Sequence, residues 1–351
     1  MSNCTASFLL AYNPIYRTSS IYQMVISIGS IVPLGYFLGF KLLKSSFHLN
    51  LKFIFIGYFV SMILFSAIYA GTATTQAIIA LISYTECDVI IPSVPHKYLL
   101  TTISFLLTLS TLFPISITIE RYYAMKNAEK YEKMKMILGP CLVGINILLN
   151  FCVIFNIFHR ESFSDPSVSF SVYPAVAAQK VGSLAASKYP FFQIFTVFLI
   201  LFCLNLIDVL FDFILLRQNI SLKKKLKNSS LTTKYQLEEV YQSTKFSLFI
   251  VFIHIFSFGL YVSAVVFFRY LGGLVVSNGN HLFGIRTFAS TMIPTYHLIL
   301  GIISIIVFNR IKSKKSEGTT IQMSSTGNSG ANNYDQAIFS IWNSHSNVVV
   351  I

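Results

Sequence analysis

The sequence predicts an all-α membrane protein, a bundle of seven transmembrane helices. Of its 351 residues, 54% are hydrophobic and only 11% are charged, whereas soluble proteins carry about 25% charged residues. Seven apolar stretches run through the chain, each long enough to cross a hydrocarbon core of about 30 Å as a helix. The basic residues between these stretches fall mostly in alternate connections.

Charged side chains are nearly absent from the seven stretches. Six of the stretches contain no Asp, Glu, Lys or Arg, and the fifth contains only Asp208 and Asp212. A lipid environment is therefore the natural solvent for all seven. The stretches are Ser20–Phe40, Phe53–Ala80, Tyr98–Ile119, Met136–Ile157, Pro190–Leu216, Phe246–Phe268 and Thr287–Phe308.

The distribution of basic residues predicts the orientation of the bundle. The connections after the first, third and fifth stretches, together with the tail, hold 19 Lys and Arg residues, and all other connecting segments hold 7. Because cytoplasmic connections are the richer in Lys and Arg, the N-terminus is expected outside and the C-terminus in the cytoplasm. The same basic segments suit contact with anionic membrane lipid.

The domain organisation follows from this topology. Residues 1–19 form an extracellular N-terminus without the basic start of a cleaved signal peptide. Residues 20–310 form the transmembrane domain. Residues 311–351 are rich in Ser, Thr, Asn and Gly and are expected to form a disordered cytoplasmic tail.

Two of the five cysteines, Cys4 and Cys87, fall in predicted extracellular segments. That compartment is oxidising, so the sequence allows either a Cys4–Cys87 disulfide or two unpaired thiols. The long connection 158–189 contains no cysteine that would compete. Asn3 begins the sequence Asn-Cys-Thr, which matches a glycosylation site.

Charged residues gather at the predicted cytoplasmic end of the third stretch, as Glu120-Arg121-Tyr122. Arg121 is either an interface anchor that reaches water or one partner of an ion pair whose breaking exposes it to another protein. Its acid partner is either Glu120 or an acid on another helix. We favour the switch over the anchor.

Asp208 and Asp212 are spaced by four residues and share one face of the fifth stretch. Because acids are costly inside a membrane, both are expected to face the bundle interior and to have a partner. Arg121 and Lys245 lie at a similar depth. We expect Asp208 or Asp212 to pair with Arg121 and to hold an inactive state, unless Asp212 reaches interfacial water instead.

Aromatic residues make up 15% of the chain, which suits a cavity for a small and largely apolar ligand. Four residues with suitable side chains lie in the predicted outer half of the membrane. They are Tyr98, Thr102 and Phe105 on the third stretch and Tyr261 on the sixth. These four residues are the ligand-binding candidates.

Several functional classes find no support in the residues. The sequence contains no Cys/His cluster, phosphate-binding loop or nucleophile–base pair, so we expect no enzyme, cofactor or metal site. His254 and His297 stand alone on different stretches and are expected to hydrogen-bond to neighbouring helices. No basic groove with interleaved aromatic residues indicates nucleic acid.

Three segments resemble the nematode serpentine chemoreceptors. They are Asn13–Arg17 before the first stretch, Glu120–Ala124, and Leu231–Glu239 before the sixth. The resemblance covers residues 1 to about 315 and is nearest to the beta or alpha/beta classes of the alpha/beta superclass. It implies a G-protein-coupled receptor of the plasma membrane of sensory neurons, in their cilia. The implied partners are a small-molecule ligand, a heterotrimeric G protein and further copies of the receptor.

The chain departs from the rhodopsin-type pattern. The sixth stretch has neither Trp nor Pro, and Ile293-Pro294-Thr295-Tyr296 stands where Asn-Pro-x-x-Tyr is usual. Two other functional classes stay open from the sequence. One is a ligand-gated channel subunit or a transporter with seven helices, and the other is a structural membrane protein without a ligand.

Overall fold

Helices make up nearly all of the described chain. In the computed structural model, the described residues are 3–89, 93–127, 131, 135–158, 190–225 and 231–319, and they contain no strand. The helices are α1 (Asn3–Ala11), α2 (Pro14–Tyr36), the π-helix η1 (Phe37–Leu42), α3 (Leu49–Ile82), α4 (Ser93–Lys126), α6 (Leu138–Phe158), α7 (Pro190–Lys225), α8 (Leu231–Tyr270), α9 (Gly272–Val275), α10 (Gly279–Ala289) and α11 (Met292–Thr319).

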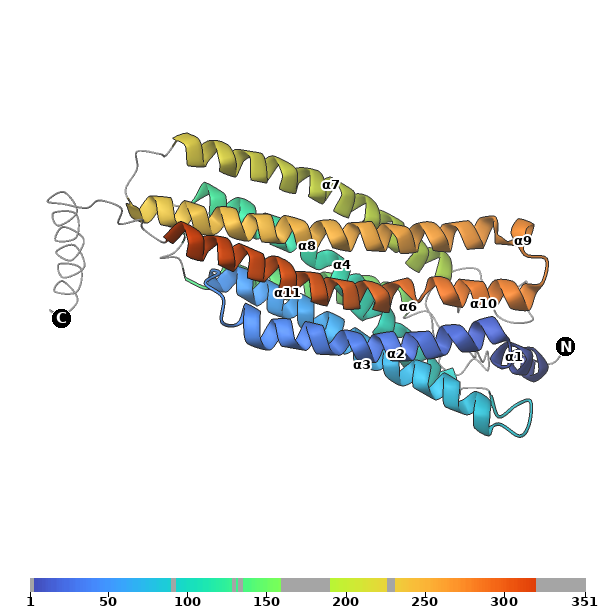
Figure 1. Ribbon diagram of the computed structural model, residues 1–351. Helices are drawn as coiled ribbons and strands as arrows, with labels where there is room; N and C mark the ends of the chain where they lie inside the picture. The colour runs from blue at the N-terminus through green and yellow to red at the C-terminus, as the bar shows by residue number, and fades with distance from the viewer. Residues whose placement is uncertain are drawn as a thin grey trace, which may run out of the picture. The chain divides into compact units, whose positions relative to one another are not determined.

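Seven segments of these helices are long and apolar enough to cross a membrane, which confirms the predicted number of spans. They are Pro14–Leu42, Leu49–Ile79, Lys97–Lys126, Leu138–Phe158, Thr196–Leu222, Leu237–Phe268 and Gly284–Ile311. The long helices lie alongside one another (Figure 1). Several begin before the apolar stretch that predicted them, because polar and capping residues extend the helix beyond the apolar core.

The start of α2 illustrates this extension. Asn13 caps the helix, and its Oδ1 atom accepts hydrogen bonds from the backbone N–H groups of Ile15 at 3.0 Å and Tyr16 at 3.4 Å. Pro14 occupies the first helical position, where no backbone donor is required. The helix therefore begins at Pro14, six residues before the predicted stretch.

Helix α4 is the centre of the bundle. It packs against α3, α6, α7 and α8, and 72% of the residues in its most apolar window are buried, against 28% for α6 and for α7. Residues of α4 can therefore contact several other helices at once. This position makes the charged end of α4 a junction between helices.

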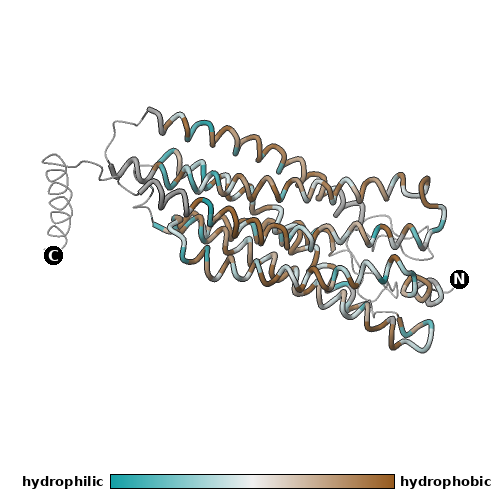
Figure 2. The backbone as a smooth tube through the Cα atoms, in the orientation of Figure 1, coloured by the Kyte–Doolittle hydropathy of each residue, from teal (hydrophilic) through white to brown (hydrophobic). Residues whose placement is uncertain are grey.

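The surface of the bundle is apolar along the spans. Phe256 is 60% exposed, and Leu148 and Leu210 are similarly exposed. Figure 2 shows hydrophobic residues along the long helices and hydrophilic residues toward their ends and connections. An exposed apolar surface of this extent fits contact with lipid.

Small residues allow two close helix contacts. The backbone N–H of Gly139 on α6 donates to Oδ1 of Asn50 on α3 at 3.1 Å, and a Cβ atom at Gly139 would overlap the Asn50 backbone. Gly301 on α11 approaches Pro33 and Leu34 of α2 in the same way, since an added Cβ atom would lie 3.0 Å from the Leu34 nitrogen.

The bundle belongs to a compact unit that spans Met1–Phe308, and a second unit begins at Asn309. Helix α11 continues to Thr319, so the first residues of the segment expected to be disordered are helical. Residues 320–351 lie outside the described residues.

Candidate functional site

Glu120 and Arg121 form a buried ion pair near the C-terminal end of α4. Nε of Arg121 donates to Oε2 of Glu120 at 2.6 Å, and Nη2 donates to Oε1 at 2.8 Å. The two side chains are 0% and 2% exposed. The pair is therefore bidentate and shielded from solvent, a geometry in which removing one partner leaves an uncompensated buried charge. It is the one ion pair among the residues that the structure describes.

Two further side chains complete the hydrogen bonds of this pair. Nη1 of Arg121 donates to the hydroxyl of Ser243 on α8, and the hydroxyl of Tyr131 donates to Oε1 of Glu120. The ring of Tyr131 packs against the imidazole of His48, with 4.1 Å between the centroids and 42° between the ring planes. The pair thus connects α4 to α8 and to the segments before α3 and after α4. We call Glu120, Arg121, Tyr131 and Ser243 the arginine cluster.

Asp208 and Asp212 lie on the buried side of α7, at 6% and 1% exposure, as their spacing predicts. Asp212 accepts a hydrogen bond at 2.9 Å from the hydroxyl of Thr118, three residues before Arg121 on α4. Neither aspartate forms an ion pair with Arg121 in this conformation, since the described residues contain only the Glu120–Arg121 pair. Each aspartate keeps one buried oxygen without a hydrogen-bond partner.

The other two predicted residues of this end lie on the surface. Tyr122 is 45% exposed, and the ammonium group of Lys126 lies 5.0 Å from its ring centroid. Lys245 is also exposed and forms no ion pair among the described residues. Both side chains therefore lie outside the arginine cluster, on a surface accessible to a partner or to lipid.

A second polar cluster lies in the middle of the bundle, between α3, α8 and α11. The hydroxyls of Tyr58 and Tyr296 lie 2.6 Å apart, and Nδ1 of His254 lies 3.2 Å and 2.7 Å from them. This arrangement confirms that His254 bonds to neighbouring helices. His297 also does so, through Ser66 on α3 at 3.0 Å. Tyr58 and Tyr296 were not selected from the sequence, although a tyrosine within an apolar stretch usually signals a buried hydroxyl that needs a partner.

The four ligand-binding candidates differ in exposure, and none of them lines the cavity between α1, α2 and α3. Tyr98 is 62% exposed, and Thr102 is exposed and donates to the Tyr98 carbonyl of its own helix at 2.8 Å. Phe105 packs from the side against the apolar core that contains Tyr261, which is 2% exposed. Depth alone selected these residues, and depth does not tell whether a side chain faces the core or the surface.

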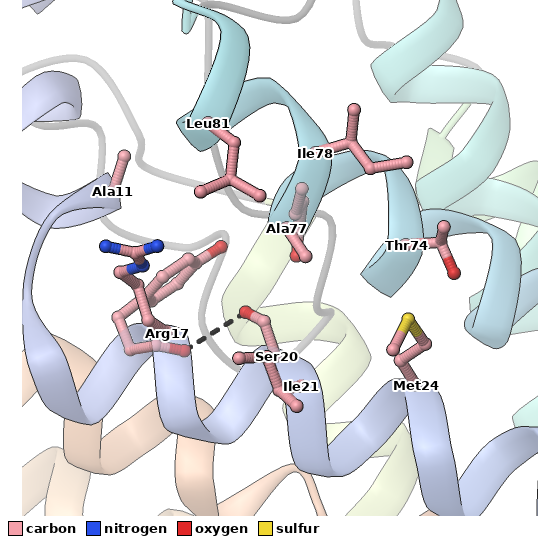
Figure 3. A pocket seen from close by; sticks show the side chains of 11 residues that line it. Ala11, Arg17, Ser20, Ile21, Met24, Thr74, Ala77, Ile78 and Leu81 are labelled. Atoms are coloured by element: carbon pink, nitrogen blue, oxygen red, sulfur yellow. Dashed lines mark hydrogen bonds between the residues drawn. The ribbon is translucent and has the colours of Figure 1, made fainter.

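A cavity of about 360 Å³ lies instead between α1, α2 and α3 (Figure 3). Side chains of α2 and α3 form its two walls, and Ala11 of α1 closes one end. Arg17 of α2 lines it together with mostly apolar side chains. The cavity is at the end of the bundle opposite the arginine cluster, because α3 and α4 run antiparallel and α1 contacts α3.

The turn between α3 and α4 is close to α1. The hydroxyl of Thr5 donates to Oε2 of Glu86 at 2.5 Å, and the neighbouring Cys87 is disulfide-bonded. The backbone N–H groups of Thr85 and Tyr84 donate to Asp88 at 2.8 and 3.2 Å, and these bonds hold the pKa of that carboxyl below its ordinary value.

The predicted Cys4–Cys87 disulfide and the predicted glycan on Asn3 each involve a side chain that the structure does not describe. The side chains of Asn3 and Cys4 lie outside the described side chains, so the Cys4–Cys87 pairing and glycosylation of Asn3 stay predictions. Cys141, Cys152 and Cys203 are free thiols. No group of His, Cys, Asp and Glu suited to a metal ion occurs in the described part of the chain.

Comparison with known sequences gives a consistent result. The model of the family described as "Serpentine type 7TM GPCR chemoreceptor Srb" matches residues 12–258. The chain is 61% identical over 343 residues to "Serpentine receptor class beta-11" of Caenorhabditis elegans, with 98% of this chain and 95% of that protein covered. It is 46% identical to "Serpentine receptor class beta-15" of the same organism, with 97% and 98% covered.

These matches resolve the alternatives that the resemblance left open, because they name the beta class. They also identify a family of receptors and not of enzymes. With seven apolar helices and this similarity over almost its whole length, the chain belongs to the Srb family of serpentine chemoreceptors, nematode proteins of the G-protein-coupled receptor type.

Proposed function

We propose that this protein binds a small-molecule cue from the extracellular side and signals to a heterotrimeric G protein. The observation that carries the proposal is the arginine cluster, a buried ion pair held across α4 and α8 by Ser243. Such a pair can exist in two arrangements, one buried between helices and one exposed to a partner, and a ligand that favours one arrangement shifts the population.

The orientation rests on charge. The 19 basic residues of alternate connections and the tail, against 7 elsewhere, favour a cytoplasmic arginine cluster and an extracellular N-terminus. Tyr122 and Lys245 then lie on the cytoplasmic surface, where a G protein or anionic lipid would contact them. The receptor works in the plasma membrane of a sensory neuron, in its cilia.

Activation begins with displacement of α8 relative to α4. This motion separates Ser243 from Arg121 and leaves a buried guanidinium donor without a partner. Arg121 then leaves Glu120 for the G protein or for the unpartnered oxygens of Asp208 and Asp212. The contact between Thr118 and Asp212 supports the aspartates as the new partners of Arg121, because it already holds α7 against α4 near Arg121.

Expression in a cell line that lacks related receptors tests the proposal. The receptor is co-expressed with a set of Gα subunits and exposed to a library of volatile and water-soluble compounds, while second-messenger levels and membrane current are recorded together. We expect a compound-dependent second-messenger response that needs one Gα subunit. A ligand-gated current that persists without any Gα subunit would favour a channel and contradict the proposal.

A further inference from the structure

The cavity between α1, α2 and α3 combines apolar walls with one cationic side chain. Ile21 and Met24 come from α2, and Ala77, Ile78 and Leu81 from α3. Figure 3 shows these side chains on the two facing helices, with Arg17 on the same side of α2 as Ser20. An apolar cavity with few polar groups is the usual form of a small-molecule site.

Two of the hydroxyl groups around the cavity, those of Ser20 and Thr74, bond within their own helices. Ser20 donates to the Tyr16 carbonyl at 3.1 Å, and Thr74 donates to the Ala70 carbonyl at 2.7 Å. These bonds satisfy the hydroxyl donors, so Ser20 and Thr74 offer a ligand mainly carbon surface. Tyr16 and Gln76, each 1% exposed, are further polar side chains of the lining, and Arg17 is its one charged side chain. Recognition of a charged group then depends on Arg17.

Arg17 has no carboxylate partner among the described residues. Its guanidinium carbon lies 5.9 Å from the ring centroid of Tyr12, and the one ion pair of the described chain is elsewhere. The acids of the turn after α3 have other contacts, since Glu86 accepts from Thr5 and Asp88 accepts from backbone N–H groups. A half-buried guanidinium at an apolar cavity favours an anionic group on the occupant.

The dimensions limit the size of that occupant. A volume of about 360 Å³ is at the small end of ligand cavities, which span roughly 300–1,000 Å³. Arg17 and Met24 are seven residues apart on one helix, so about 10 Å of helix separates the charge from the far part of the α2 wall. The cavity is thus too small for a two-chain phospholipid.

The cavity also opens toward the outside of the bundle. Ile21 is 50% exposed, Ile78 49% and Leu81 69%, although all three line it. An apolar chain could therefore enter between α2 and α3 from the membrane side while its charged end stays near the helix terminus. This entry route suits an amphiphile better than a polar solute.

We infer that this cavity binds a small single-chain anion, a medium-length aliphatic carboxylate, with Arg17 holding the carboxylate and the α2 and α3 side chains enclosing the chain. The inference deepens the proposed function, on which it rests, by naming the ligand class and the place of binding. The family segment Asn13–Arg17 thereby gains a role for its last residue.

Binding of radiolabelled octanoate to the purified full-length receptor tests this inference. The receptor is placed in nanodiscs of neutral phosphatidylcholine without a G protein. We expect saturable binding, with octanol binding about tenfold or more weakly because it lacks the charge. From hexanoate to octanoate the affinity should rise about fourfold per methylene. Equal affinity for octanoate and octanol would overturn the inference, and this comparison needs no variant.

Variants locate the site. Arg17→Gln should weaken octanoate binding by about tenfold or more, whereas Arg17→Lys should retain most of it. Ala77→Phe should abolish binding by filling the cavity. Lys44→Gln, which removes a cation from the other end of the first span, is the matched control and should bind normally. Normal octanoate binding by a well-folded Ala77→Phe variant would contradict the inference. Loss of octanoate binding when phosphatidylserine replaces a fraction of the phosphatidylcholine would also contradict it.

The binding and signalling measurements separate the two proposals. The receptor could respond to another compound through a G protein and yet bind no octanoate. This result would disprove the octanoate site and leave the proposed function in place. Octanoate binding that depends on Arg17, in a protein that activates no Gα subunit, would support the site and count against the proposed function.

Discussion

Arg121 of α4 donates from Nη1 to the hydroxyl of Ser243 on α8, while its other nitrogens bind Glu120. One small side chain on a neighbouring helix thus completes the bonding of a buried charge. Within the described part of α8, the hydroxyl of Ser243 is the group seen to bond this pair. A motion of α8 away from α4 would therefore break this contact. The Ser243 hydroxyl is therefore where we expect activation to be controlled.

Replacing Ser243 by Ala should raise basal signalling. The substitution removes one hydrogen bond to a buried charge, worth about 1.5–3 kcal/mol, and weakens the arrangement that buries Arg121. We expect a rise of several-fold in second-messenger level without ligand, measured at matched surface expression. Ser247 lies one turn further along α8, is also buried, and its hydroxyl has no hydrogen-bond partner. Ser247→Ala is therefore the control, and an equal effect of both variants would contradict a specific role for Ser243.

Replacing Glu120 by Gln should destabilise the receptor. The change keeps the size of the side chain but leaves Arg121 buried without its counter-ion, which costs about 3–5 kcal/mol. A lower thermal unfolding temperature in detergent, together with raised basal signalling, is the expected result. Tyr122→Phe alters a neighbouring but exposed side chain and should leave the unfolding temperature unchanged. A Glu120→Gln protein as stable as the wild type would show that the pair is not energetically coupled to the fold.

The double substitution Asp208→Asn with Asp212→Asn tests the acid face of α7. If these acids form an ion pair with Arg121 in the active state, the double substitution should lower ligand-driven signalling by about tenfold. This is the effect of losing one charge-assisted hydrogen bond. Surface expression and basal signalling serve as references. Thr118→Val removes the hydrogen bond to Asp212 and a longer one to the Pro114 carbonyl but keeps both acids, so it should have a smaller effect. Unchanged signalling in the double variant would exclude both acids from the switch.

The sequence identified the charged residues of this end of the bundle but not their partners. Charges are rare in apolar stretches, so Arg121, Asp208 and Asp212 stand out from composition alone. Ser243 does not stand out, because serines are common within membrane helices and only the rotation of α8 about its axis turns this one toward Arg121. Tyr131 lies in a connection, where periodicity gives no information about the direction of a side chain.

The sequence also did not predict which side chains at the opposite end of the bundle line a cavity. Depth in the membrane placed Tyr98 and Thr102 near the predicted outer surface, but the first turns of α4 leave both exposed. Arg17 was noted only as part of a family segment. Its position at a cavity depends on how α2, α3 and α1 pack, which hydropathy cannot report.

Removing the hydroxyl of Tyr296 should loosen the middle of the bundle. This hydroxyl contacts both Tyr58 and His254, so Tyr296→Phe removes two buried hydrogen bonds and leaves only the 3.2 Å contact between Tyr58 and His254. The loss should cost about 1–3 kcal/mol. Thermal unfolding measures the loss. Tyr22→Phe is the matched control, because the Tyr22 hydroxyl bonds Thr295 at 3.3 Å on the exposed side of α2 and should contribute little. Equal unfolding temperatures for the two variants would contradict a structural role for the inner cluster.

The pairing of Cys4 with Cys87 predicts a definite thiol count. Alkylation of the unfolded protein without reductant should modify three cysteines, the free thiols Cys141, Cys152 and Cys203, and alkylation after reduction should modify all five. In Cys87→Ser the unreduced count should rise from three to four, because Cys4 loses its partner, whereas in Cys141→Ser it should fall from three to two. Intact mass spectrometry reads each count directly. An unreduced Cys87→Ser protein in which Cys4 resists alkylation would show that Cys4 is not the partner of Cys87.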